Sequence, residues 1–130
     1  MGYIGIAGHM GKELKAQFLA KLGGLPCKYA DVLDDECWST FRGGSSTAVL
    51  VIDSSLFRDP HSMWQARWLT IEAWNSGRRR FVVCLLDIDG LEDNNSWIVE
   101  SVKKYTNYCA IGIDDSAKMI KERWDTEGCQ

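Results

Sequence analysis

The sequence lacks the residue pattern of a metal or disulfide framework. It has only two histidines, His9 and His61, and its five cysteines form no Cys-x-x-Cys pair. This does not give the ligand spacing of a zinc site, so we predict no metal. An odd number of cysteines without a preceding signal peptide predicts free thiols in the cytoplasm. Cys84 and Cys109 lie inside apolar runs, so we expect both to pack as small hydrophobic residues.

Long apolar runs and a strong charge imbalance are also missing. No apolar run approaches the roughly 18 residues that span a bilayer, so no membrane segment is predicted. The formal net charge of -3 argues against nucleic acid or an anionic membrane as a partner, because these partners select a basic face. The one basic run, Arg78-Arg79-Arg80, precedes a predicted strand and fits a solvated turn as well as a phosphate clamp.

Length and composition fit one globular domain that spans residues 1–130. Hydrophobic residues make up 45% of the chain and charged residues 25%, which is ordinary for a globular protein. A chain of 130 residues can bury a core without a metal or disulfides. No internal repeat, low-complexity tract or linker divides it.

Apolar runs and helical spacing alternate along the whole chain. The run Ala48–Ile52 is apolar without alternation, which is typical of a strand covered on both faces of a parallel sheet. We therefore predict an α/β, flavodoxin-like three-layer fold, with a five-stranded parallel sheet, helices on both faces and a ligand crevice at the carboxyl ends of the strands. The predicted strands are 3–7, 27–32, 47–52, 81–86 and 108–113, and the predicted helices are 12–22, 34–41, 62–76, 96–105 and 116–124.

The turn after the first strand, Gly8-His9-Met10-Gly11-Lys12, is a candidate binding loop. In this fold it faces the crevice, and its backbone amides could bind a phosphate. It differs from a nucleotide kinase phosphate loop, because Ile6 and Glu13 stand where that loop has a glycine and a hydroxyl residue. An ordinary tight turn is therefore the alternative to ligand binding by Gly8 and His9.

Three tryptophans, Trp64, Trp68 and Trp74, lie on the predicted helix 62–76. They could form an aromatic wall for a nucleobase, which makes Trp64 and Trp68 candidate ligand-binding residues. Aromatic residues at helical spacing more often pack inward, so we expect this stripe to belong to the core.

Residues 46–89 resemble a Toll/interleukin-1 receptor (TIR) domain. The matching segments are the strand 47–52, Asp53-Ser54-Ser55-Leu56-Phe57, Ser62-Met63-Trp64 at a helix start, Gly77-Arg78-Arg79-Arg80-Phe81-Val82-Val83 and Asp87-Ile88-Asp89. The resemblance implies a flavodoxin-like fold and a role in innate-immune or defence signalling. It also implies contacts with other TIR domains or self-association, which is our leading prediction.

The sequence departs from the TIR pattern at two places. The segment Asp31–Asp35 has neither the Arg-Asp nor the Pro-Gly of the family's assembly loop. Trp68 stands where enzymatic TIR domains carry a glutamate that acts on NAD, and the nearest carboxylate, Glu72, lies one turn further along.

An enzyme that cleaves or cyclises NAD is the alternative function. NAD would be its substrate, no cofactor is predicted, and Glu72 would be the catalytic residue. A carboxylate in that role stabilises the oxocarbenium-like sugar that forms as the bond to nicotinamide breaks. Glu72 lies at the edge of the apolar stripe of its helix, so a solvated glutamate is the competing interpretation.

A second alternative is a nucleotide-binding protein. The segment Ala7-Gly8-His9-Met10 is similar to the opening Ala-Gly-Pro turn of nucleoside deoxyribosyltransferases. That group has the same fold and acts on the same type of bond, and Asp53 and Asp59 fall near the positions of its carboxylates. Under this resemblance Asp53 is a candidate ligand-binding residue.

Overall fold

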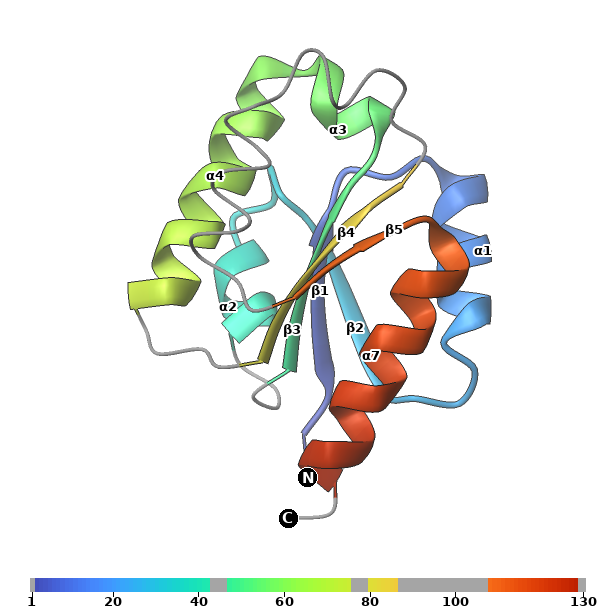
Figure 1. The fold of residues 1–130 in the computed structure, drawn as a ribbon. Coiled ribbons are helices and arrows are strands. Elements are labelled where there is room, and N and C mark those ends of the chain that lie inside the picture. The colour runs from blue at the N-terminus through green and yellow to red at the C-terminus, as the bar shows by residue number, and fades with distance from the viewer. Residues whose placement is uncertain (1, 43–46, 76–79, 87–107, 129–130) are drawn as a thin grey trace.

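The computed structural model describes residues 2–42, 47–75, 80–86 and 108–128. Within them, five strands form one parallel sheet in the order β2-β1-β3-β4-β5, which confirms the predicted flavodoxin-like α/β fold (Figure 1). The strands are β1 (Ile4–Gly8), β2 (Cys27–Asp31), β3 (Thr47–Ile52), β4 (Arg80–Leu85) and β5 (Tyr108–Ile111). The helices are α1 (Lys12–Lys21), α2 (Cys37–Arg42), α3 (Ser54–Arg58), α4 (Pro60–Asn75) and α7 (Ile113–Gly128).

Some expectations fall on residues outside these ranges. The predicted helix 96–105 is one of them. The others are Gly77, Arg78 and Arg79, and the segment Asp87-Ile88-Asp89 of the TIR resemblance.

Successive residues of a strand point to opposite faces of the sheet, and in the central strands both faces are buried. Helices α2, α3 and α4 cover one face, and α1 and α7 cover the other (Figure 1). On the first face the core of the sheet is built from Ala7, Ala48, Leu50, Ile52, Phe81, Val83 and Leu85. On the second face it is built from Ile4, Ile6, Val49, Val51, Val82 and Cys84. Burial of β3 on both faces therefore explains why its sequence is apolar without alternation, as predicted from the sequence.

Helix α2 approaches strand β1 closely at Gly5. A Cβ atom added to Gly5 would lie 2.5 Å from the carbonyl oxygen of Thr40 and 2.6 Å from that of Phe41. Both neighbours are backbone atoms, which cannot rotate away as a side chain can. Glycine at this position therefore allows α2 to lie against the sheet.

A short helix that the sequence pattern does not predict, α3, follows β3 directly. Its N-cap is Asp53, whose Oδ1 accepts a hydrogen bond from the backbone N–H of Leu56 at 2.9 Å. Asp53 thus both ends the strand and begins the helix, since its side chain binds an amide that a helix leaves unpaired. The expected helix 62–76 begins two residues earlier, at Pro60.

The tryptophan stripe of α4 points away from the core, so the expected core position is wrong for Trp64 and Trp68. Trp64 is 65% exposed and Trp68 is 42% exposed. The side chain of Trp74 lies outside the described part of the structure. The buried face of α4 instead carries small or non-aromatic residues, namely Ser62, Met63, Ala66, Leu69, Thr70 and Ala73. Small residues let the helix lie close to the sheet, where an indole ring would not fit.

The cysteines differ in their surroundings. The described cysteines Cys27, Cys37, Cys84 and Cys109 are free thiols, as predicted. Cys84 is buried in β4, but Cys109 is exposed, so the expectation of core packing is wrong for Cys109. The reason is its place on β5, which is an edge strand of the sheet. Among the helices that the structure describes, none combines the length and apolar character needed to cross a membrane.

Substituting Gly5 by alanine should destabilise the fold by about 2 kcal/mol, because the added methyl group forces the backbone of α2 away from β1. The free energy of unfolding, measured by denaturant titration, checks this. Gly11→Ala is the matched control, since a Cβ there meets nothing within 4 Å. Equal stability of the two variants would contradict the close approach of α2.

Candidate functional site

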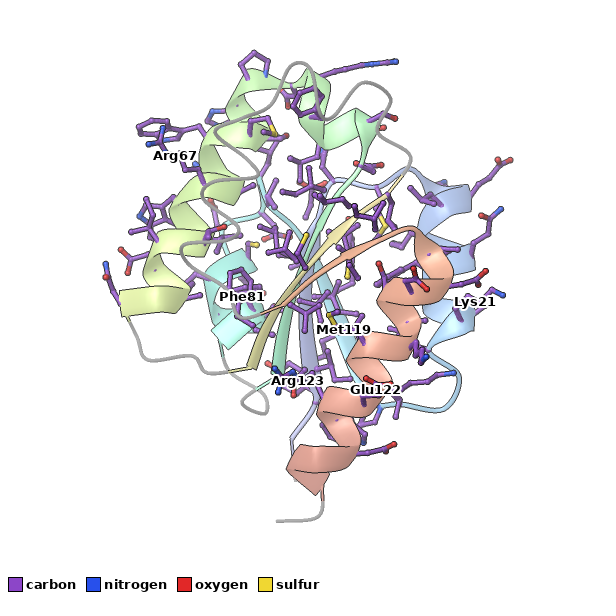
Figure 2. All side chains as sticks on the ribbon, in the orientation of Figure 1. Lys21, Arg67, Phe81, Met119, Glu122 and Arg123 are labelled. Atoms are coloured by element: carbon purple, nitrogen blue, oxygen red, sulfur yellow. The ribbon has the colours of Figure 1, made fainter. Side chains whose placement is uncertain are left out.

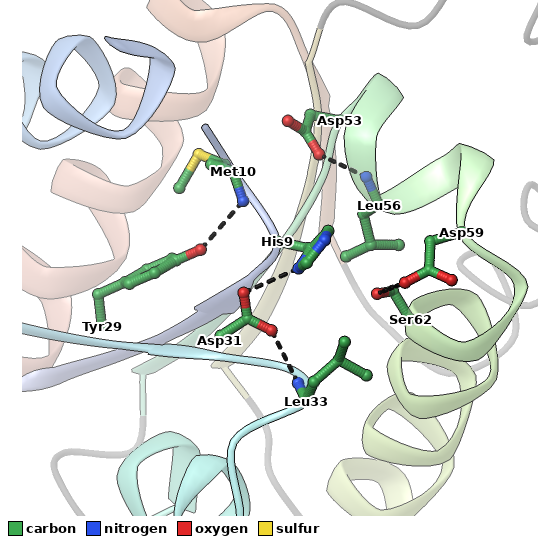
Figure 3. A network of polar contacts seen from close by, with 9 residues as sticks. All are labelled: His9, Met10, Tyr29, Asp31, Leu33, Asp53, Leu56, Asp59 and Ser62. Atoms are coloured by element: carbon green, nitrogen blue, oxygen red, sulfur yellow. Dashed lines mark hydrogen bonds and ion pairs between the residues drawn. The ribbon is translucent and has the colours of Figure 1, made fainter. Parts of the chain in front are cut away.

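The carboxyl ends of β1, β2 and β3 bring five polar side chains together (Figure 3). His9 follows β1, Asp31 ends β2, and Asp53 follows β3, while Asp59 and Ser62 lie at the start of α4. In a sheet of this order the strand order switches between β1 and β3, because β2 was added on one side of β1 and β3 on the other, and open α/β sheets bind ligands at such a switch point. We call these five residues the carboxyl-end site.

His9 and Asp31 form the central pair of this site. Nδ1 of His9 lies 2.8 Å from Oδ2 of Asp31, and the other oxygen of Asp31 accepts a hydrogen bond from the backbone N–H of Leu33 at 2.8 Å. The side chains of His9 and Asp31 are 32% and 40% exposed, so a ligand can reach them. The contact with Asp31 engages Nδ1 and leaves Nε2 for a ligand or a proton.

Two further carboxylates lie on the other side of the imidazole, and their environments differ (Figure 3). Burial raises the pKa of Asp53, an effect opposed by the hydrogen bond from the Leu56 N–H and by the nearby His9. The pKa of Asp59 is lowered, chiefly because the Ser62 hydroxyl donates a hydrogen bond to Oδ2 of Asp59 at 2.7 Å. The site therefore holds one carboxyl group that resists ionisation and one that favours it.

Tyr29 fixes the turn that carries His9. The backbone N–H of Met10 donates a hydrogen bond to the Tyr29 hydroxyl at 3.1 Å, and Nζ of Lys15 lies 5.0 Å from the centroid of the Tyr29 ring. Burial raises the pKa of Tyr29 to about 12, so this hydroxyl stays protonated at neutral pH. Gly8 sits beneath the same turn, where an added Cβ would lie 3.2 Å from the Val51 carbonyl oxygen.

The structure brings together four of the residues singled out in the sequence, namely Gly8, His9, Asp53 and Asp59. It does not bring Glu72 to them. Helix α4 leaves the carboxyl edge at Pro60 and returns to the start of β4, and Glu72 lies twelve residues along it. At 1.5 Å per residue this is about 18 Å from the beginning of the helix.

The other candidates lie elsewhere, and two residues that hold the loop after β1 were missed. Trp64 and Trp68 lie on the outer face of α4, away from His9. Sequence reasoning missed Asp31 and Tyr29 as partners of the loop after β1. The position of Asp31 near the end of a predicted strand could have indicated its contact with the loop after β1, because the carboxyl ends of neighbouring parallel strands lie at the same edge of the sheet.

The described part of the chain contains no group of three or more histidine, cysteine or acidic side chains arranged to hold a metal ion. What the site offers is a set of acceptors and one imidazole. Carboxylates accept hydrogen bonds from hydroxyl groups, and an imidazole held by a carboxylate can take or give a proton. The arrangement therefore suits a hydroxyl-rich ligand and acid–base chemistry.

No protein-family model, curated protein or solved structure matches the chain. The geometry of the carboxyl-end site is therefore the observation that bears on function.

Asp53→Asn should change the pH dependence of stability. Asparagine keeps an oxygen that can cap α3 but cannot ionise. Because the folded-state pKa of Asp53 is raised, the wild-type protein loses stability as pH rises through the ordinary value of 3.8 toward the raised value. Asp53→Asn should gain stability relative to wild type over that range and keep the gain at higher pH, as measured by denaturant unfolding at stepped pH.

Asp53→Ala is the control for the cap. It removes the bond to the Leu56 N–H and should cost about 1 kcal/mol near neutral pH. A difference between Asp53→Asn and wild type that is the same at every pH would contradict the raised pKa.

Proposed function

We propose that the chain binds a nucleoside at the carboxyl-end site and cleaves the bond between its base and its sugar. The observation that carries this proposal is the pairing of His9 with Asp31, with Asp53 and Asp59 on the other side of the imidazole. The carboxylates supply acceptors for the sugar hydroxyls, and Asp31 holds His9 in one orientation.

The reaction needs the groups that the site contains. As the C1′–N bond breaks, its electron pair goes to the base and positive charge develops on the sugar. An ionised carboxylate stabilises that charge, and Asp59, with its lowered pKa, is the group suited to it. Water adds its oxygen to C1′ and gives a proton to Nε2 of His9, which passes a proton to the departing base.

The position of Glu72 favours this reaction over the NAD-cleaving alternative. Glu72 lies about 18 Å along α4 from the start of the helix, so its carboxylate is too far away to contact the same ligand sugar as His9. Cleavage of NAD through Glu72 would need a separate site near the other end of α4.

Turnover assays distinguish nucleoside cleavage from NAD cleavage. Purified protein is incubated with purine and pyrimidine nucleosides, and separately with NAD, and the released bases are measured by chromatography. His9→Gln should lower nucleoside cleavage at least about 100-fold, because it removes the proton carrier. Glu72→Gln is the matched control and should keep wild-type activity.

Two results would count against the proposal. Loss of activity in Glu72→Gln but not in His9→Gln would transfer the function to the NAD alternative. Absence of cleavage, combined with no rise in melting temperature on adding nucleosides, would exclude a nucleoside site, because a ligand that binds the folded state stabilises it.

A second candidate function, assembly of the TIR type, is supported by the outer surface of α4. A shallow depression of about 240 Å³ is lined by Trp64, Arg67, Trp68 and Ile71, and Arg67 lies on the side of α4 away from the sheet (Figure 2). We call this surface the outer tryptophan face. Exposed tryptophans next to an arginine are typical of the centre of protein interfaces. We propose that this face mediates self-association or contact with another TIR domain.

Double substitution of Trp64 and Trp68 by serine should shift the protein to the monomer, because it removes both aromatic anchors of the face. Analytical ultracentrifugation over a range of protein concentrations measures this. Leu33→Ser is the matched control, since Leu33 is also apolar and 40% exposed but does not lie on α4. A wild-type protein that stays monomeric at all concentrations would rule out self-association through this face.

A further inference from the structure

A second groove lies between α4 and the segment that joins β2 to α2. It has a volume of about 250 Å³, and its lining includes Leu33, Asp34, Asp35, Trp38, Gln65 and Trp68. Helices α2 and α4 cover the same face of the sheet, which brings these residues together (Figure 1). None of His9, Asp53 and Asp59 lines it, so it is separate from the carboxyl-end site. We call it the α2–α4 groove.

Two indole rings from different helices meet in this groove. The rings of Trp38 and Trp68 have centroids 5.6 Å apart and planes inclined at 68°, so their faces point in different directions. Trp38 is fixed from behind by the core, where its ring lies 6.2 Å from that of Phe41. Because the two ring planes are steeply inclined to each other, their electron-rich faces point in two directions, and such faces attract a cation.

The charges of the lining select the same kind of ligand. Asp34 and Asp35 both line the groove and are exposed, and none of the described lining residues is basic. Oδ1 of Asp34 accepts a hydrogen bond from the Glu36 N–H at 2.9 Å, which holds this acidic turn in place. The remaining walls include Val32, Leu33 and Leu69, which are apolar.

An aromatic pair, acidic residues and apolar walls together suit a cation that carries methyl groups. A metal ion or a primary ammonium is strongly hydrated and loses that hydration against leucine and valine side chains. An alkylated ammonium has an apolar surface and a full positive charge, so it gains from both kinds of wall.

We propose that the α2–α4 groove binds an alkylated ammonium group of the trimethylammonium type. This site goes beyond the proposed nucleoside function and does not depend on it. Trp38 and Trp68 contact the methyl groups, and Asp34 and Asp35 supply the opposing charge.

Choline and its uncharged isostere 3,3-dimethylbutanol form the test pair. Nuclear magnetic resonance titration of the folded wild-type protein follows the indole N–H signals. Choline should shift the signals of Trp38 and Trp68 and saturate with a Kd of about 1 mM, and the isostere should bind at least about fivefold more weakly.

Variants locate the site. Asp35 is exposed, so Asp35→Asn should leave the fold intact. It should weaken choline binding about threefold, because it removes one negative charge. Trp68→Leu should abolish saturable binding. Trp64→Leu is the matched control, because Trp64 lies on the same helix but does not line the groove.

Two results would overturn the proposal. Equal binding of choline and its isostere would show that the groove selects apolar shape rather than charge. Absence of any saturable shift at Trp38 and Trp68 with choline, in protein that is folded by the same spectra, would show that no such site exists. Tighter binding of N-acetyl trimethyllysine amide than of choline would support the proposal and identify a methylated protein side chain as the source of the group.

Discussion

Exclusion of water from both faces of β1 and β3 is the constraint on which the structure depends. Every residue of these two strands is buried, so no polar side chain can serve a ligand from the middle of the sheet. Polar groups are therefore restricted to the strand ends, where water and ligands have access. Because the strands are parallel, the ends of β1, β2 and β3 meet at one edge, and the carboxyl-end site forms there.

The site places like charges close together, and its hydrogen bonds offset part of that repulsion. Asp31 is held by His9 and the Leu33 N–H, Asp53 by the Leu56 N–H, and Asp59 by the Ser62 hydroxyl. Each carboxylate also fixes local backbone or the imidazole, so the acidic residues serve the fold as well as the site. Removing any one of them should therefore change both stability and chemistry.

The sequence predicts the fold better than it predicts the site. The strand Thr47–Ile52 is visible from its composition alone, since all of its residues after Thr47 are apolar. The pairing of His9 with Asp31 is not visible, since it depends on β2 lying next to β1 across twenty-two residues of chain. The orientation of Trp64 and Trp68 was missed for a different reason. Helical periodicity identifies a stripe of large residues, but Ala66 and Ala73 on another side of α4 allow closer packing and take the buried position.

The topology also has a consequence for the order in which the molecule is assembled. Strand β1 pairs with β2 on one side and β3 on the other, and all three lie within residues 4–52. Contacts between segments close in sequence form quickly, because little chain entropy is lost in closing the loops between them. By this rule β1–β2 and β4–β5 are the most local pairings and β1–β3 is the most distant, since Ile4 pairs across to Cys27 and Val82 to Tyr108, but Gly5 to Ala48. The pairing of β1 with β3, which brings His9 next to Asp53, would then form last, so the ligand-facing edge is completed late in folding.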